Sequence, residues 1–229
     1  MKFGSLFAGI GGFDLGLERA GMTCSWQVEI DPFCNKVLEK HWPNVRRYAD
    51  VREVGKHNLE PVELICGGFP CQPHSVAGKR KGADDDRNLW PEYLRIIKEI
   101  RPRWVIGENV PGIITTILDQ VLSDLESAEY TVETLIIPAC AFNAPHRRNR
   151  VWVLAHAERA GLKTRIVGQG QVKFRGGNSW ASWWQTEPDV GRVADGVPDR
   201  VDRLKSLGNA VVPQVVEWIG NRIMEQNDT

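Results

Sequence analysis

The stretch Ser5-Leu6-Phe7-Ala8-Gly9-Ile10-Gly11-Gly12-Phe13 decides the fold of this 229-residue chain. Its first residues predict a short buried strand, and a helix is expected from about Asp14 to Ala20, ended by Gly21. The glycines between strand and helix predict a turn whose backbone amides can meet a ligand at the helix start. Because Gly-x-Gly-Gly also forms tight turns in unrelated folds, this stretch alone does not identify the ligand.

Acidic residues end the next two predicted strands. Cys24–Ile30 reads as a strand that carries Glu29, about 20 residues after the glycine turn, where a carboxylate can accept both ribose hydroxyls of an adenosine. After a predicted helix over Pro32–His41, a short strand at Arg46–Ala49 ends in Asp50, which in this topology lies beside an adenine amine. The alternative for Glu29 is a solvated charge at a strand end.

A cysteine follows the fourth predicted strand. The apolar run Val62–Cys66 leads into Gly67-Gly68-Phe69-Pro70-Cys71-Gln72-Pro73, and open parallel sheets bind ligands at this end of their strands. The glycines allow close backbone approach and the prolines stiffen the turn, so the stretch presents a thiol. The loop from Gln72 to Arg87 is long, which is typical of a functional lid or of a disordered segment. The alternative is that Cys71 packs as an ordinary small hydrophobic residue.

The middle of the chain repeats the strand-then-helix pattern. Trp104–Gly107 predicts a strand that delivers Glu108 at its end, and Tyr130–Ile137 predicts another strand. Helical spacing marks one apolar stripe at Leu89, Tyr93, Ile96, Ile97 and Ile100, closed by Pro102, and a second at Ile114, Ile117, Leu118, Val121, Leu122 and Leu125.

Two arginines precede the apolar strand Val151–Ala155. If the residues just before this strand are also extended, Arg148 and Arg150 would project to the same side, because side chains alternate along a strand. Two guanidinium groups aimed one way suit an anionic or carbonyl-rich ligand. The alternative is a basic surface without a ligand.

Composition sets the class of protein. The formal net charge is zero, so the net charge does not indicate a nucleic-acid partner. The five cysteines are odd in number and lack Cys-x-x-Cys spacing, which argues against a disulfide framework and against a zinc site and predicts a reduced, cytoplasmic protein without a metal. No signal-peptide pattern and no apolar run of membrane-spanning length occurs in the sequence, so no membrane association is expected.

The character of the sequence changes after residue 155. From His156 to about Asp199 the apolar periodicity disappears, and no acid occurs between Glu158 and Glu187. Basic residues interleaved with glycine, amides and tryptophans suit a nucleic-acid surface, although a solvated loop packed on the main domain is the alternative. A final helix is predicted with Val212, Val215, Val216, Ile219 and Ile223 on one face.

Five short motifs occur in order along the chain: Phe7-Ala8-Gly9-Ile10-Gly11-Gly12, Pro70-Cys71-Gln72, Glu108-Asn109-Val110, Arg148-x-Arg150 and Gly208-Asn209-Ala210-Val211. With this set the chain strongly resembles the DNA cytosine carbon-5 methyltransferases over residues 3 to 155 and 200 to about 220. The resemblance implies an α/β, Rossmann-like fold, that of the methyltransferases that use S-adenosyl-L-methionine (AdoMet). Its sheet has seven mostly parallel strands, one of them antiparallel, with helices on both faces.

The resemblance also implies a cofactor site for AdoMet. Phe7 would stack on the adenine, Glu29 would hold the ribose, and Asp50 would accept from the adenine amine. The other positions assigned to the cofactor are Ala8, Gly9, Gly11, Gly12, Ile30, Val51, Pro70, Leu89, Asn209 and Ala210.

Carbon 5 of cytosine is too weak a nucleophile to take a methyl group unaided. By resemblance, Cys71 as the thiolate would add to carbon 6 while Glu108 protonates or hydrogen-bonds the ring nitrogen and amine. Arg150 would hold the carbonyl oxygen of the base, and Arg148 would organise the site. Because a stacked base cannot be reached, the cytosine must flip out of double-stranded DNA.

The chain departs from the family pattern in three places. His146, Phe142 and Asn143 replace the usual Gln and Tyr-Gly before the arginine pair, and His74 stands where an aromatic residue is common. We expect altered loop packing there and retained chemistry. The region between the arginine and asparagine motifs is also short and lacks the usual Thr-Leu dipeptide.

Three segments are therefore expected: an AdoMet-binding catalytic domain at 1–155, a shortened target-recognition region at 156–199, and a C-terminal segment at 200–229 that packs back on the catalytic domain. Within the second, Gly168–Gln171 and Arg175–Asn178 are candidates for base-edge contacts.

The leading hypothesis is a DNA methyltransferase of the restriction-modification type, with a cognate restriction endonuclease or an auxiliary recognition subunit as a partner. One alternative is a tRNA cytosine methyltransferase, although its Cys-Phe-Thr tripeptide is absent. Another is a DNA-binding or regulatory relative without activity, which the joint presence of Cys71, Glu108, Arg148 and Arg150 argues against.

Overall fold

The computed structural model describes residues 1–70, 88–142, 144, 146–157 and 200–227. The strands are β1 (Lys2–Leu6), β2 (Thr23–Val28), β3 (Arg46–Tyr48), β4 (Leu64–Gly67), β5 (Trp104–Asn109), β6 (Tyr130–Pro138) and β7 (Asn149–Ala157). The α-helices are α1 (Gly12–Arg19), α2 (Pro32–His41), α3 (Trp90–Ile100), α4 (Leu118–Ser127), α5 (Arg200–Asn209) and α6 (Pro213–Asn227). Short 3₁₀ helices are η1 (Val51–Glu53), η2 (Pro111–Thr115) and η3 (Ala139–Phe142).

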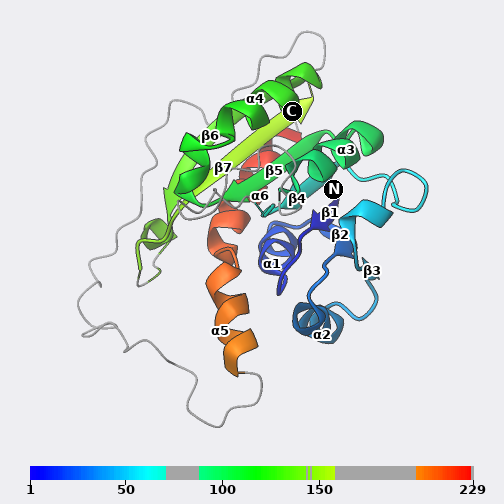
Figure 1. Ribbon diagram of the computed structural model, residues 1–229, viewed down its shortest axis with the longest axis vertical. Helices are drawn as coiled ribbons and strands as arrows, with labels where there is room; N and C mark the ends of the chain where they lie inside the picture. Colours follow the sequence, from blue (N-terminus) through cyan, green and yellow to red (C-terminus); the bar gives the residue numbers. More distant parts are fainter. Residues whose placement is uncertain (71–87, 143, 145, 158–199, 228–229) are drawn as a thin grey trace, which may run out of the picture.

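The strands form a single sheet in the order β3-β2-β1-β4-β5-β7-β6 (Figure 1). The pairs from β3 through β5 are parallel, and β7 runs antiparallel to both of its neighbours. The expected mostly parallel seven-stranded sheet with one antiparallel strand is confirmed. Parallel strands need crossover connections, and here helices supply them on both faces.

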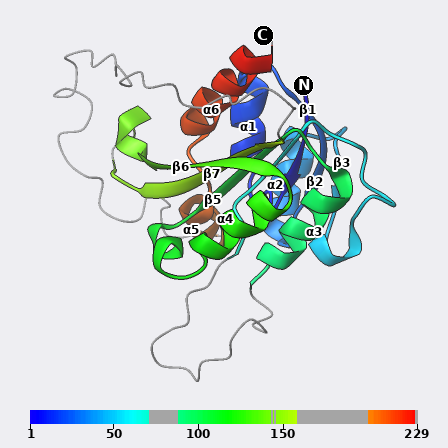
Figure 2. The same ribbon diagram turned by 90° about the horizontal axis from the view of Figure 1, so that it is seen from above.

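Two helical layers cover the sheet. Helices α1 and α6 lie on one face, and α3 and α4 lie on the other (Figure 2). The predicted stripe on α3 is confirmed, since Tyr93, Ile96 and Ile97 are fully buried in the core beneath it. No helix in the described part of the chain is both long and apolar enough to cross a membrane.

A buried carboxylate fixes the start of α1 on the sheet. Asp14, in the first turn, is completely buried, and its carboxylate accepts hydrogen bonds from Ser5 Oγ at 3.1 Å and Gln27 Nε2 at 2.9 Å. The Cys24 thiol donates a third at 3.3 Å. Burial raises the pKa of Asp14, and these hydrogen bonds partly oppose the rise. The glycine turn is thereby held against β1 and β2.

Gly16 brings α1 into direct contact with α6. A β-carbon added there would lie 2.5 Å from Val216 Cβ and 2.6 Å from the Pro213 carbonyl oxygen. We expect Gly16→Ala to lower the free energy of unfolding by about 1–3 kcal/mol, measured by urea denaturation, because the helices must separate. Gly208→Ala is the control, because an added β-carbon there meets no atom of the described residues within 4 Å. An equal loss of stability in both variants would contradict this packing.

The structure corrects three expectations about local geometry. The predicted continuous stripe from Ile114 to Leu125 is broken, since Ile114 lies in η2 with 44% exposure and α4 begins only at Leu118. Glu108 lies within β5, which extends to Asn109. Arg148 precedes β7 and has a positive φ of 32°, so the side-chain alternation of a strand does not apply to it.

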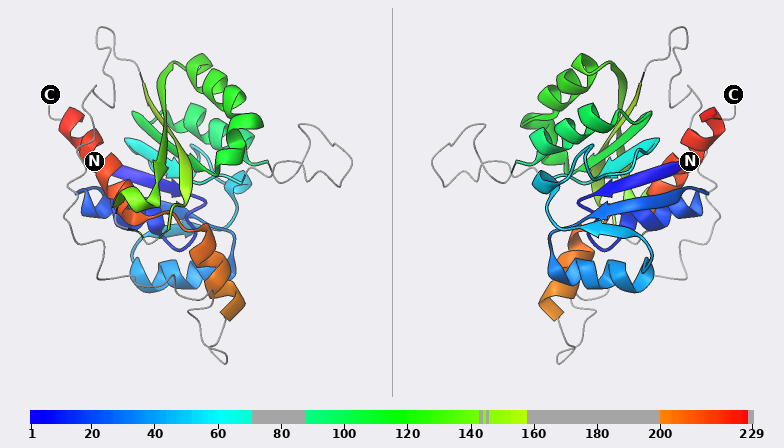
Figure 3. Two further views of the ribbon diagram at one scale, coloured as in Figure 1. Left: turned by 90° about the vertical axis from the view of Figure 1, so that its left-hand side faces the viewer. Right: turned by 90° about the vertical axis from the view of Figure 1, so that its right-hand side faces the viewer.

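Helix α5 was not anticipated. It is a polar helix, and Ser206 is its one buried residue among those whose side chains are described. Val201, Leu204 and Leu207 recur at helical spacing, but this pattern covers only three positions and is too short to predict a helix. The helix stands beside the start of α2 (Figure 3), where Lys205 Nζ lies 3.4 Å from Asp31 Oδ2.

Candidate active site

A cavity of about 610 Å³ lies where β1, β2, β4 and β5 reach their carboxyl ends. Of the positions expected to bind the cofactor, it is lined by Phe7, Ala8, Gly9, Gly12, Glu29, Ile30, Asp50, Val51, Pro70, Leu89, Asn209 and Ala210. Gly11 is the exception: it lines a neighbouring cavity of about 710 Å³, and a β-carbon there would lie 2.3 Å from the Trp42 ring. Residues far apart in the sequence therefore share one cavity.

Glu29 organises the wall of the cavity at the end of β2. Its Oε2 accepts the Gly9 backbone N–H at 2.7 Å, and its Oε1 accepts the Asp31 backbone N–H at 2.7 Å. Asp31 in turn caps α2 by accepting from the backbone of Phe33 and Cys34. Because each carboxylate oxygen has two lone pairs, Glu29 can still accept from a ligand.

Asp50 and Phe7 lie on other walls of the same cavity. The Asp50 carboxylate caps η1 by accepting the Arg52 N–H at 2.9 Å. Phe7 has a positive φ of 53°, and its ring makes an edge contact with Tyr93 at a centroid distance of 6.1 Å. Burial of Tyr93 in the core therefore gives the Phe7 ring a fixed support.

Glu108 is the buried acid of the site, with 7% of its surface exposed. Burial raises its pKa from an ordinary 4.5 to about 7, against the lowering influence of Arg150 and Arg148. Arg150 Nε lies 2.8 Å from Glu108 Oε1 and forms an ion pair with it, and among the described residues no group donates a hydrogen bond to Oε1. A carboxyl group with this pKa can both hold and release a proton near neutral pH.

Arg148 approaches the site from outside β7. Its Nη2 donates to the Ala210 carbonyl oxygen at 2.7 Å, which ties the arginine to the segment before α6. Its Nε is buried, and no group among the described residues accepts a hydrogen bond from it. The two arginines therefore differ: Arg150 contacts the acid, and Arg148 holds a cavity wall.

Asn109 joins β5 to the turn that leads toward Cys71. Its Nδ2 donates to the Phe69 carbonyl oxygen at 2.9 Å, and its Oδ1 accepts the Val110 N–H. A β-carbon at Gly68 would lie 3.0 Å from Glu108 Oε2, so this turn passes close to the acid. Cys71 itself, the predicted nucleophile, lies outside the described residues, as does His74.

Several lining residues were missed by the reading of the sequence. Asp31, Cys34, Lys205 and Ser206 line the cavity, and Cys34 Sγ lies 3.6 Å from Ser206 Oγ. A helix cap signal at Asp31 was the only clue available. Lys205 and Ser206 lie on α5, which was not predicted, whereas Asn209 at the end of that helix was found through the Gly208-Asn209-Ala210-Val211 motif.

The sheet order, the glycine turn and the cavity at the strand ends define the class of AdoMet-dependent methyltransferase folds. Solved structures agree. A putative DNA modification methyltransferase from a prophage of E. coli is similar, with a TM-score of 0.59, 28% identity and coverage of 69% of this chain and 47% of that one. A DNMT2 mutant from Spodoptera frugiperda shares the fold, with a TM-score of 0.61 and 19% identity over 72% of this chain and 52% of that one.

Residues 1–177 match the family described as C-5 cytosine-specific DNA methylase, and the chain belongs to that family. Relatives include the type II methyltransferase M.HgiCII of Herpetosiphon aurantiacus, 34% identical over 70% of this chain and 38% of the relative. The type II methyltransferase M2.BsuMI of Bacillus subtilis (strain 168) is 38% identical over 68% of this chain and 42% of the relative. The chain thus spans less than half the length of these curated relatives, and the resemblance read from the motifs is confirmed.

Proposed function

We propose that the protein transfers a methyl group from AdoMet to carbon 5 of a flipped-out cytosine in DNA, through a covalent Cys71 adduct at carbon 6. The observation that carries the proposal is the presence of the buried acid Glu108 in the same cavity as Glu29 and Asp50. One cavity thereby offers acceptors for a nucleoside and an acid with a pKa of about 7 for a base. Pro70, the residue before Cys71, also lines it.

The lining suits AdoMet. The volume of about 610 Å³ is in the usual range of small-molecule sites, about 300–1,000 Å³. Glu29 can accept from ribose hydroxyls, Asp50 can accept from the adenine amine, and the Phe7 ring can stack on the base. When bound, AdoMet supplies an activated methyl group on a sulfonium.

The protein residues prepare the cytosine for this methyl group. Cys71, as the thiolate, adds to carbon 6, and Glu108 gives a proton or a hydrogen bond to the ring nitrogen, so electron density builds up at carbon 5. Arg150 holds the carbonyl oxygen of the base and orients Glu108 through their ion pair. After carbon 5 takes the methyl group, loss of its proton returns electrons to the ring and expels the cysteine.

Glu29→Ala should weaken AdoMet binding by about 10- to 100-fold, because hydrogen bonds to a charged acceptor are lost. The glycine turn also loses its Gly9 contact in this variant. Titration calorimetry measures the effect, DNA binding is expected to stay unchanged, and Glu39→Ala on the exposed side of α2 is the control. Wild-type AdoMet affinity in Glu29→Ala would refute the ribose assignment.

The reaction is tested with labelled AdoMet and either genomic DNA or tRNA. Label should enter DNA. Label in tRNA alone would favour the tRNA cytosine methyltransferase alternative, and label in neither would favour a relative without activity. Bisulfite sequencing of DNA from an expressing strain would then give the recognition sequence.

The proposal extends to the setting of the enzyme. Double-stranded DNA is its substrate and base flipping exposes the target, within a restriction-modification system that includes a cognate endonuclease or an auxiliary recognition subunit. The three-segment organisation, with recognition by residues 156–199, belongs to the same proposal, although residues 158–199 lie outside the described part. Free thiols at Cys24, Cys34, Cys66 and Cys140 support a reducing, cytoplasmic location.

A further inference from the structure

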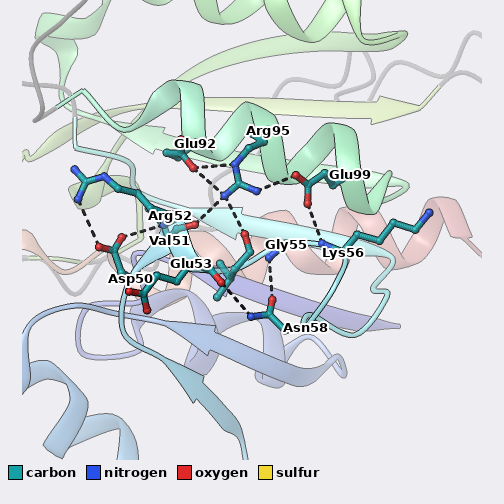
Figure 4. Close-up of polar contacts among 11 residues, drawn as sticks. Asp50, Val51, Arg52, Glu53, Gly55, Lys56, Asn58, Glu92, Arg95 and Glu99 are labelled. Carbon is teal, nitrogen blue, oxygen red and sulfur yellow. Dashed lines mark hydrogen bonds and ion pairs between the residues drawn. The ribbon is translucent and has the colours of Figure 1, made fainter.

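Arg95, on α3, joins this helix to the segment that follows β3. Its Nη2 donates to the Val51 carbonyl oxygen at 3.0 Å and to the Val54 carbonyl oxygen at 2.9 Å. These carbonyls stand at the first residue of η1 and just after its last residue. One guanidinium group therefore holds both ends of the 3₁₀ helix (Figure 4).

Two acids of α3 hold the guanidinium itself in place. Arg95 Nε donates to Glu92 Oε2 at 2.9 Å, and Arg95 Nη1 donates to Glu99 Oε1 at 2.9 Å. The acids lie three residues before and four residues after the arginine, on the same side of the helix. With its planar fork occupied on both sides, the side chain has little freedom left to turn away.

Glu99 makes a second connection to the same segment. Its Oε2 accepts the Lys56 backbone N–H at 2.9 Å, and a β-carbon added at Gly55 would lie 2.3 Å from that oxygen. In Figure 4 the side chains of Arg95 and Glu99 point from α3 toward the segment that carries Gly55 and Lys56. Only a residue without a side chain fits at position 55 without displacing Glu99.

The segment held in this way forms one end of the cavity. Asp50, Val51 and Arg52 line the cavity, and the Asp50 carboxylate takes its orientation from capping the Arg52 N–H. Arg95 itself does not line the cavity. Any influence of Arg95 on a ligand must therefore pass through η1.

We infer that Arg95 is a positioning residue that sets the purine specificity of the cofactor site, by fixing η1 so that Asp50 accepts the exocyclic amine of adenine. This inference rests on the proposed AdoMet-dependent function. The alternative is that burial of Val51 and Val54 in the core fixes η1 without help from Arg95.

The test compares two ligands that differ only at the purine: S-adenosylhomocysteine, whose adenine carries an amine, and S-inosylhomocysteine, whose base carries a carbonyl oxygen. Titration calorimetry of the wild-type protein should show preference for the adenosyl compound, because a carboxylate cannot accept from a carbonyl. In Arg95→Met the affinity for the adenosyl compound should fall about tenfold, and the preference should shrink with it. Arg95→Lys should retain part of the preference, since an ammonium can reach one carbonyl but cannot fork.

Arg101→Met is the matched control. Arg101 caps the other end of α3 and makes a similar pair of contacts, to the Ala128 carbonyl oxygen at 2.8 Å and to Glu129 Oε2 at 2.9 Å, away from the cavity. Its loss should leave the ligand preference at the wild-type value. Gly55→Ala would displace Glu99 from the segment, so it disturbs the same contact from the other partner. It should therefore reduce the preference for the adenosyl compound even if Arg95→Met folds poorly.

The outcomes separate the inference from the proposed function. An unchanged preference in Arg95→Met and Gly55→Ala, with both ligands weakened equally, would overturn the positioning role. A wild-type protein that binds neither ligand would overturn the AdoMet site itself, and the inference would fall with it.

Discussion

Cys71→Ser should abolish methyl transfer to DNA, with a loss of about 10³-fold or more in rate. A serine hydroxyl has nearly the shape of the thiol but stays protonated at neutral pH, so it cannot add to carbon 6. The measurement is the rate at which label passes from AdoMet to DNA. Cys140→Ser, the same change at a partly buried cysteine outside the cavity, should retain the wild-type rate.

DNA that contains 5-fluorocytosine tests the covalent step directly. Fluorine at carbon 5 cannot leave as the proton does, so the wild-type protein should remain attached to this DNA under denaturing conditions. Cys71→Ser should form no such complex. A fully active Cys71→Ser variant, or a trapped complex that persists without Cys71, would refute the mechanism.

Glu108→Gln should lower kcat by about 10²- to 10³-fold, because the amide cannot deliver a proton to the ring nitrogen. The wild-type kcat/KM should also decline as pH rises above about 7, where Glu108 loses its proton. The variant should lack this decline. Glu126→Gln, an exposed residue of α4, serves as the control, and an identical alkaline decline in Glu108→Gln would show that another group causes it.

The pKa of Glu108 also couples its proton to stability. The folded protein holds this proton up to about pH 7, whereas the unfolded chain releases it near 4.5. The contribution of this proton to the free energy of unfolding is therefore fully present below about pH 4.5 and is lost as pH rises to about 7. Over this pH range the free energy of unfolding of the wild type should fall relative to that of Glu108→Gln, measured by urea denaturation. A role of Glu108 confined to the transition state would produce no such difference.

Much of the fold could be read from the sequence because its signals are local. Helix α2 begins at Pro32 and ends at His41, as expected, because the N-cap residue Asp31 and the proline at the first helical position follow one another in the sequence. The central strands were found because β4 and β5 are buried on both faces and read as apolar runs. The three acids that were expected at strand ends, Glu29, Asp50 and Glu108, all line the cavity, although Glu108 lies within β5.

What the sequence could not predict depends on contacts between distant segments. Arg95 donates to backbone carbonyls more than 40 residues away, and every residue type carries the same carbonyl, so no pattern marks the acceptors. Asn109 likewise reaches the Phe69 carbonyl across the sheet. Helix α5 escaped detection because its apolar pattern is short, and the positive φ of Arg148 has no signal in the sequence, because residues other than glycine rarely adopt it.

The cavity joins the first turn of the chain to one of its last segments. Phe7 and Gly9 share its lining with Asn209 and Ala210, and α1 rests on α6 through Gly16. During synthesis on the ribosome the pocket therefore stays incomplete until nearly all of this sequence has emerged. Two fragments divided before α5 would each lack part of the pocket, and activity regained on mixing them would report their reassembly.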